Sequence, residues 1–172
     1  EQEMKVERGV IVSADGVELA VNREEGQYYL REYPQRGLTS PWLGYNSLRY
    51  GRAGVERVYN EELSGKSGLL GITGYWDELI GKTHRGADLK LTVNVALQKV
   101  AAEALGERKG AVVALDPRTG AVLAMVSYPR YDPNGLIDPN TMGTVWSEIN
   151  SDPDAPLLNR AAQGRYPPGS VF

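Results

Sequence analysis

The sequence predicts an α+β fold, with a β-rich first half and a second half that opens on a helix and a strand hairpin. Three observations predict it. Residues 9–22 place a β-branched run and an alternating run on either side of a tight-turn dipeptide. Residues 94–106 repeat apolar side chains at helical spacing, and residues 110–127 place two apolar runs around a turn that contains Pro and Gly.

The first third of the chain reads as β-structure. A β-branched run at residues 10–12 precedes Asp15-Gly16, a strong tight-turn dipeptide. Residues 17–21 then alternate between apolar and polar side chains, as in a strand with one buried face. Residues 26–33, which contain two adjacent tyrosines, supply a further strand.

The composition changes twice before the middle of the chain. Residues 34–54 are rich in Gly, Pro, Ser and Tyr, which predicts a loop with short elements. The next segment predicts a short helix that ends at Gly65. A second change near residue 86 divides the chain into two expected domains, residues 1–86 and residues 87–172.

The second domain is expected to begin with a short strand at residues 87–93 and then the best helix of the chain. Asn94 or Thr92 can cap the start of this helix and Gly106 its end. Five apolar residues share one helical face: Leu97, Val100, Ala101, Ala104 and Leu105.

A hairpin is expected at residues 110–127. Asp116-Pro117-Arg118-Thr119-Gly120 lies between the two apolar runs, with Pro suited to the start of the turn and Gly to its close. Both strands are apolar enough to be central in a sheet or covered on both faces.

Composition excludes several classes of function. The net charge of -3 among 172 residues, without a dense basic run, argues against a nucleic-acid-binding protein. The chain has no cysteine and a single histidine, His84, which we interpret as a loop residue, so neither a thiolate site nor a histidine cluster can form. No apolar stretch approaches the roughly 20 residues of a membrane span, and no leader pattern opens the chain.

Two short motifs fail on inspection. Gly65-Lys66-Ser67 resembles the end of a phosphate-binding loop, but Asn60 stands where that loop needs its first glycine. Lys82-Thr83 resembles part of the Lys-Thr-Gly motif of serine acyltransferases, but His84 stands in the glycine position. We therefore predict no nucleotide site.

Ser170 permits two readings on local grounds. It follows Pro-Pro-Gly and precedes two apolar residues, which is typical of a helix N-cap. The first turn of a helix also has unpaired N–H groups and a positive dipole end, which favour an oxyanion on or near a serine hydroxyl. A serine nucleophile needs a base, and a lysine three positions later would face it, one residue beyond Phe172.

The wider context resembles the class B penicillin-binding proteins. Residues 110–134, GAVVALDPRTGAVLAMVSYPRYDPN, and residues 157–172, LLNRAAQGRYPPGSVF, resemble the first strands of that family's transpeptidase sheet and its segment with the acylated serine. Upstream, RGVIVSADGVELA, YGRAGVERVYNEELSGKSG and LKLTVNVALQKVAAEAL resemble, in family order, two blocks of its pedestal domain and the entry to its catalytic domain. The spacing is most similar to actinobacterial members.

The resemblance implies a fold and a reaction. Residues 1–86 would form a β-rich pedestal, or dimerisation-type, domain, and residues 87–172 the opening of a transpeptidase domain of the serine β-lactamase type. Ser170 would be the acylated nucleophile, with its backbone N–H as one oxyanion donor. The resemblance implies no metal or organic cofactor. The expected activity is D,D-transpeptidation, which cross-links peptidoglycan stem peptides through an acyl-enzyme, and β-lactams would acylate the same serine.

Three departures from the family pattern accompany this resemblance. The usual Asp-Arg-Asn-Gly of the first block is Ser13-Ala14-Asp15-Gly16 here, which still forms a turn. The lysine after Phe172 and the later Ser-x-Asn and Lys-Thr-Gly motifs are not in this sequence, so the chain by itself is not expected to be active. We expect the parent protein to act at the outer face of the bacterial membrane, with one N-terminal anchor before Glu1.

Other functions stay open beside transpeptidation. The protein would be a non-catalytic scaffold if Ser170 were only a cap, or a β-lactam-recognising hydrolase or sensor if water were the acceptor. Cell-wall synthesis proteins are expected partners of the pedestal. Its aromatic residues form either a small core, which we favour, or a partner surface: Tyr28, Tyr29, Tyr33, Trp42, Tyr45 and Tyr50.

Overall fold

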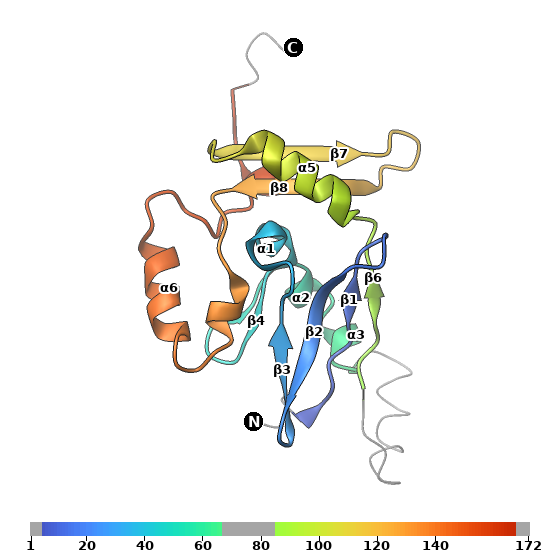
Figure 1. Cartoon of the computed structure of the whole chain (residues 1–172), viewed down its shortest axis with the longest axis vertical. Helices are drawn as coiled ribbons and strands as arrows, with labels where there is room; N and C mark the ends of the chain where they lie inside the picture. Colours follow the sequence, from blue (N-terminus) through green and yellow to red (C-terminus); the bar gives the residue numbers. More distant parts are fainter. Residues whose placement is uncertain (1–4, 67–84, 168–172) are drawn as a thin grey trace.

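A computed structural model describes residues 5–66 and 85–167 of the chain. Its largest sheet has four strands in the order β3-β2-β1-β6 (Figure 1). These are β1 (Ile11–Val12), β2 (Glu18–Glu25), β3 (Tyr28–Glu32) and β6 (Leu89–Lys90). β6 pairs parallel to β1, and the other neighbours are antiparallel. The last strand thus returns to the sheet from far along the chain.

Both hairpin turns of this sheet lie at glycine residues of the sequence. Gly16 has φ 77° between β1 and β2, and Gly26 has φ 65° between β2 and β3. Glycine adopts this left-handed conformation at little cost, whereas a side chain is strained there. The two predicted strands after Asp15-Gly16 and around Tyr28 are confirmed.

The Gly- and Pro-rich stretch folds into short elements, as predicted. They are η2 (Arg36–Leu38), α1 (Ser40–Leu43), β4 (Asn46–Ser47), β5 (Gly51–Arg52), α2 (Gly54–Val58) and α3 (Asn60–Leu63). The prediction of one helix up to Gly65 was wrong, because the chain breaks between α2 and α3 at Tyr59, where φ is -102° and ψ is 28°. The break allows both Glu56 and Leu63 to be fully buried.

The second half opens on helix α5 (Val95–Leu105), and its predicted caps are confirmed. The Asn94 side chain accepts a hydrogen bond from the Leu97 N–H, and Gly106 ends the helix with φ 61°. The predicted buried face was partly wrong: Leu97 and Val100 are 37% and 61% exposed, whereas Val95, Gln98, Ala101, Ala102 and Leu105 are buried. The helix is turned so that the polar Gln98 faces inward.

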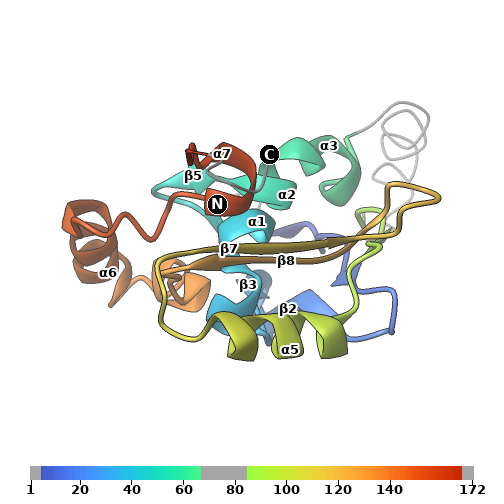
Figure 2. The same ribbon diagram turned by 90° about the horizontal axis from the view of Figure 1, so that it is seen from above.

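The predicted hairpin consists of β7 (Gly110–Leu115) and β8 (Val122–Tyr128) in antiparallel register. The Gly120 N–H donates to the Asp116 carbonyl at 2.8 Å and closes the turn. Seen from above, α5 lies on one side of the hairpin and α7 (Arg160–Gln163) on the other (Figure 2).

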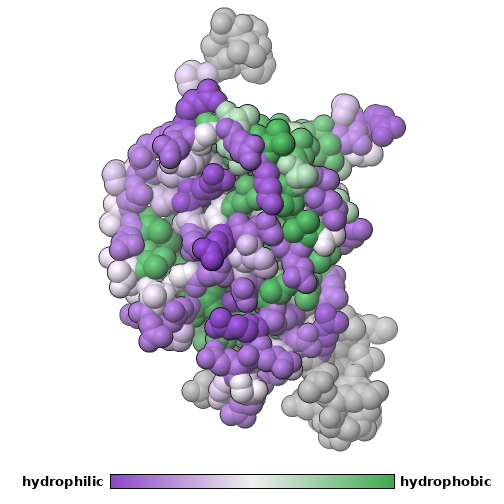
Figure 3. Space-filling model, viewed as in Figure 1, coloured by the Kyte–Doolittle hydropathy of each residue, from purple (hydrophilic) through white to green (hydrophobic). Residues whose placement is uncertain are grey.

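The prediction that both hairpin strands are central in a sheet or covered on both faces is not met for β7 within the described residues, where it pairs with β8 alone. Val113 and Leu115 are 43% and 54% exposed within the described part of the chain. Figure 3 shows apolar surface gathered at the upper end of the molecule, over the hairpin and α5.

The remaining elements join the second half to the first. After β8 come η3 (Pro133–Leu136) and α6 (Met142–Ser151), which the sequence reading did not identify. Trp146 of α6 stacks on Tyr50 with 4.4 Å between ring centroids and meets Tyr45 edge-on. Tyr131 and Leu136 are buried in the same hydrophobic cluster as Ile11, Leu19, Tyr33 and Leu43. The main core therefore spans both halves.

A buried ionic network joins the four-stranded sheet to α2. Fully buried Glu56 accepts from the Arg8 Nε at 2.8 Å and the Arg31 Nε at 2.6 Å, and the Tyr33 hydroxyl donates to it at 3.3 Å. Burial raises the pKa of Tyr33 well above its ordinary value, so the hydroxyl stays a donor. Burial is also the main reason that the pKa of Arg8 is lowered, while Glu56 opposes that shift.

The six aromatic residues of the pedestal fall into two groups, according to whether they pack in the main hydrophobic core. Tyr33, Trp42 and Tyr45 are buried, and Tyr50 packs against the cluster through Trp146. Tyr28 and Tyr29 of β3 are only half-buried. The interpretation as core residues therefore holds for four of the six.

Candidate active site

The predicted nucleophile, Ser170, lies outside the described residues, as does His84 with the Lys82-Thr83 pair. The structure describes the chain that leads to the serine, up to Pro167. The site is therefore built from the segment between α6 and Pro167, and from the elements that hold it.

Asn159 starts the last helix before the predicted serine. Its side-chain oxygen accepts from the N–H groups of Ala161 at 3.1 Å and Ala162 at 3.3 Å. Asparagine is among the preferred N-cap residues because it satisfies N–H groups that have no partner in the helix. The short helix α7 thus begins at a fixed residue.

Ser127 attaches this helix to the sheet. Its hydroxyl accepts from the Arg160 N–H at 3.0 Å and donates to the Leu158 carbonyl at 3.3 Å. Ser127 is 1% exposed and lies in β8, next to the last residue of the strand. One buried hydroxyl therefore satisfies two backbone groups of the segment between α6 and Pro167, residues 152–167, which we call the approach segment. The same hydroxyl sets where α7 crosses β8.

Arg160 fixes the loop before α7. Its side chain donates to the carbonyls of Ala155, at 3.0 Å, and Asp154. The residue is 7% exposed, and these contacts satisfy a buried guanidinium through backbone oxygens. Outside this loop, Lys109 forms an exposed ion pair with Asp154, which ties the loop to the start of β7.

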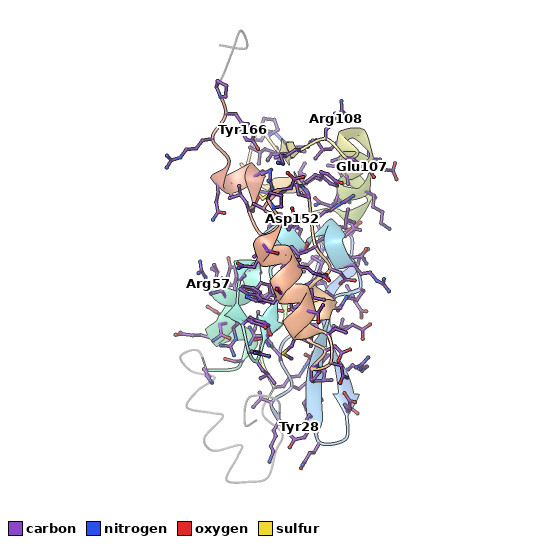
Figure 4. All side chains as sticks on the ribbon, turned by 90° about the vertical axis from the view of Figure 1, so that its left-hand side faces the viewer. Tyr28, Arg57, Glu107, Arg108, Asp152 and Tyr166 are labelled. Carbon is purple, nitrogen blue, oxygen red and sulfur yellow. The ribbon has the colours of Figure 1, made fainter. Side chains whose placement is uncertain are left out.

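The chain leaves α7 through Gly164. The Gly164 N–H donates to the Arg160 carbonyl at 3.2 Å. A Cβ at Gly164 would lie 2.4 Å from that carbonyl oxygen and 2.5 Å from the Tyr166 ring, so no side chain fits without a shift of the backbone. Beyond it, Tyr166 is 58% exposed and lies at the upper end of the molecule, far from Tyr28 at the other end (Figure 4).

The start of α5 has a second cap that the sequence reading missed. The Asp15 carboxylate, from the turn before β2, accepts from the Val95 N–H at 3.0 Å and from the Ser13 hydroxyl at 2.6 Å. The Ser13 hydrogen bond, followed by the Val95 hydrogen bond, lowers the pKa of Asp15. The only local signal was an aspartate in a turn, because its partner is 80 residues away.

The arrangement provides support for the approach segment. Helix α7, the Ser127 bridge and the Arg160 contacts hold Leu158 to Gly164 against the hairpin through buried, directional bonds. Across the described ranges, no group of three acidic, histidine or cysteine side chains is placed to hold a metal ion.

Two family profiles match consecutive parts of the chain. The Penicillin binding protein A dimerisation domain matches residues 8–89, and the Penicillin binding protein transpeptidase domain matches residues 110–172. Ser170 thus falls within the part that matches the transpeptidase domain.

Relatives agree with both matches. The chain is 38% identical over 170 residues to the peptidoglycan D,D-transpeptidase PbpA of Mycolicibacterium smegmatis, which covers 94% of this chain and 35% of the relative. It is 39% identical over 133 residues to the peptidoglycan D,D-transpeptidase MrdA of Escherichia coli, which covers 70% of this chain and 20% of that relative.

A solved structure shares the architecture. The imipenem acyl-enzyme complex of penicillin-binding protein A from M. tuberculosis superposes with a TM-score of 0.90 at 35% identity, over 98% of this chain and 41% of the other. The chain therefore spans about a third of the curated mycobacterial relatives that it matches. With a dimerisation domain followed by the opening of a transpeptidase domain, the chain belongs to the penicillin-binding protein family.

Proposed function

We propose that the protein is a peptidoglycan D,D-transpeptidase that works through an acyl-enzyme on Ser170. The observation that carries this proposal is the match of residues 110–172 to the transpeptidase profile, which follows a matched dimerisation domain at residues 8–89. The names of the PbpA and MrdA relatives, and the acyl-enzyme complexes formed by a structural neighbour, support it.

The proposed reaction has two acyl-transfer steps. The Ser170 hydroxyl oxygen attacks the carbonyl of the penultimate residue of a stem peptide while a base takes its proton. The C–N bond to the terminal residue then breaks as the protonated base gives that proton to the leaving amine. The amine of a second stem peptide then attacks the ester and releases the serine. The Ser170 backbone N–H supplies one hydrogen bond to the oxyanion of each tetrahedral intermediate.

The described residues support the proposal through the chain that leads to the serine segment, residues 168–172. The chain enters it from α7, which Ser127 and Arg160 hold on β8. A displacement of about 1 Å in a reacting group lowers rates by about 10²-fold, so a buried anchorage at Arg160, ten residues before the nucleophile, suits a preorganised site.

A fluorescent penicillin tests the proposal on the full-length protein. We expect a covalent label that maps to Ser170 by peptide mass spectrometry and is lost in Ser170→Ala. A protein that folds but takes no label contradicts the acyl-transfer function and supports a non-catalytic scaffold. A label that is released within minutes, in step with hydrolysis of the penicillin, supports the β-lactam hydrolase instead.

Location, partners and domain limits belong to the same proposal. We place the enzyme at the outer face of the bacterial membrane, anchored by one N-terminal span, with the pedestal (residues 1–86) available to cell-wall synthesis proteins and residues 87–172 in the transpeptidase domain. Within the described ranges, no helix has the length and apolarity to cross a bilayer. A gene product that begins at Glu1, or one exported without an anchor, contradicts the anchor.

A further inference from the structure

Gln98 is a polar side chain at the centre of an apolar interface. It lies on the inner face of α5 and is 0% exposed, between the buried residues Val95 and Ala102 of the same helix. Burying an amide is unfavourable unless its polar atoms find partners. All the partners of Gln98 are backbone groups, and they belong to two distant segments.

The first segment is strand β8. The Gln98 Nε2 donates to the Met125 carbonyl at 2.6 Å, and the Met125 N–H donates to the Gln98 Oε1 at 2.8 Å. This is the pair of hydrogen bonds that a neighbouring strand would make with Met125. The side-chain amide therefore closes the edge of β8 that faces away from β7 and holds the strand at that residue.

The second segment belongs to the pedestal. The Gln98 Nε2 also donates to the Leu38 carbonyl at 3.0 Å, at the end of η2. The Leu38 side chain packs against both hydrophobic clusters: the main core, which spans both halves of the molecule, and the smaller cluster between α5 and the hairpin. One amide group thus ties a pedestal element, a helix and a strand of the second half together.

A short path leads from Gln98 to the serine segment. Met125 lies two residues before Ser127 in β8, and Ser127 holds both Leu158 and Arg160. A change in the position of β8 relative to the pedestal therefore reaches α7 through one strand and one buried hydroxyl. Covalent chain then continues from α7 to Ser170.

We propose that Gln98 is a positioning residue: its amide locks β8 to the pedestal and so fixes α7, and with it the placement of Ser170. This inference rests on the proposed acyl transfer. It goes beyond that function because it makes the reactivity of the serine depend on a contact between α5, β8 and η2. Gln98 does not touch the reacting atoms.

The first test removes the three hydrogen bonds. In the full-length protein, Gln98→Leu keeps a buried side chain but leaves the Met125 N–H and the Met125 and Leu38 carbonyls without their partner. We expect the rate constant for acylation of Ser170 by a fluorescent penicillin, measured at saturation, to fall at least about tenfold. The penicillin concentration for half-saturation should change much less. A folded variant with a rate within about twofold of the wild type overturns the proposal.

A control separates positioning from general loss of stability. Leu105 lies in the same helix, is 9% exposed, and packs in the cluster of α5 and the hairpin without contacting these hydrogen bonds. Leu105→Ala should lower the unfolding temperature at least as much as Gln98→Leu, yet retain the wild-type acylation rate. Equal rate losses in two equally destabilised variants assign Gln98 a structural role only and overturn the proposal.

The second test introduces a titratable group that can restore two of the bonds. A neutral Glu at position 98 can accept from the Met125 N–H and donate to one carbonyl, whereas a carboxylate cannot donate. In Gln98→Glu we expect the acylation rate, relative to wild type at each pH, to be within a few-fold at about pH 5.5 and to fall at least about tenfold by about pH 8. Gln98→Leu should show a constant ratio. A pH-independent ratio for Gln98→Glu contradicts the proposal.

Hydrogen exchange distinguishes failure of this inference from failure of the proposed function. If wild-type protein takes no penicillin label, the acyl-transfer function fails. The exchange of Asn159–Gln163 amides still reports on positioning. We expect these amides to exchange faster in Gln98→Leu than in Leu105→Ala. Unchanged exchange in α7 overturns the role of Gln98 whatever the activity.

Discussion

At the scale of single residues, the molecule relies on a few buried polar groups whose partners are distant in sequence. Glu56 binds Arg8 and Arg31, which are 48 and 25 residues away. Ser127 binds Arg160 across 33 residues. No local pattern predicts such pairs, because an arginine or glutamate in a mixed sequence is usually exposed. This is why the sequence reading found the strands of the pedestal but missed the buried network that joins them to α2.

Glu56→Gln should be strongly destabilising. Two arginines, 8% and 5% exposed, would lose the charge that compensates them. Removing one partner of a buried ionic group costs about 3–5 kcal/mol. Chemical unfolding of the full-length protein at neutral pH measures this loss. Glu25→Gln is the matched control, because the Arg23–Glu25 pair is exposed at 3.8 Å and should contribute nothing measurable. Equal effects of both changes would contradict the buried network.

Gly164→Ala should affect the acylation rate of Ser170 more than it affects the free energy of unfolding. The new methyl group meets the Arg160 carbonyl and forces the chain to leave α7 along another path. We expect the acylation rate of Ser170 to fall about tenfold or more, since small misplacements are costly in catalysis. Gly143→Ala in α6 is the control: its Cβ would have only Arg49 Nη1 nearby, at 3.8 Å. A normal rate in Gly164→Ala shows that the exit from α7 does not position the serine.

At the scale of elements, local signals predicted what local physics determines. The Asn94 and Gly106 caps of α5 and the hairpin turn of residues 116–120 were found because each depends on residues within about one helical or strand turn. The orientation of α5 was not predicted, because the Gln98 side chain turns inward and donates hydrogen bonds to the carbonyls of Met125 and Leu38. The periodic apolar pattern predicts instead that Leu97 and Val100 lie on the buried face of the helix. Helix α6 was missed, although Val145 and Ile149 lie one turn apart in it.

The start of α5 should depend on pH through Asp15. Its folded pKa is lowered, mainly by the Ser13 hydroxyl, so its contribution to stability is complete above its ordinary pKa of about 3.9 and is lost as the pH falls through the folded value. Asp15→Asn should therefore be less stable than wild type at pH 7. The difference between the two should shrink below about pH 4. Unfolding curves at several pH values measure it, and a gap that widens in acid contradicts the cap.

At the scale of the whole molecule, the two matched domains share one core. Tyr131, Leu136 and Trp146, from the second half, pack with the pedestal cluster that contains Tyr33 and Tyr45. The sequence divides at residue 86 by composition, but the packing continues across that point: β6 pairs with β1. Composition shows where the character of the sequence changes, but it does not show which surfaces pack against each other in the folded protein.

Trp146→Ala should lower the free energy of unfolding of both halves of the molecule together. The change removes the ring stacked on Tyr50 and the edge-on contact with Tyr45, at a cost of about 2–4 kcal/mol for a half-buried aromatic. Trp146→Phe keeps most of the stacking and should cost less. We expect unfolding followed by far-UV circular dichroism and by near-UV circular dichroism to coincide in the wild type. Two separate transitions would show that the halves unfold independently.

The two edges of the hairpin sheet differ in a way that matters during biosynthesis. Gln98 occupies the edge of β8, whereas within the described residues β7 pairs with β8 alone and exposes Val113 and Leu115. An apolar edge strand recruits other strands, including those of identical chains. While the edge of β7 that faces away from β8 has no strand beside it, nascent or truncated chains should self-associate through that edge. A lysine at Val113, which lies outside the core, should then raise the yield of soluble protein.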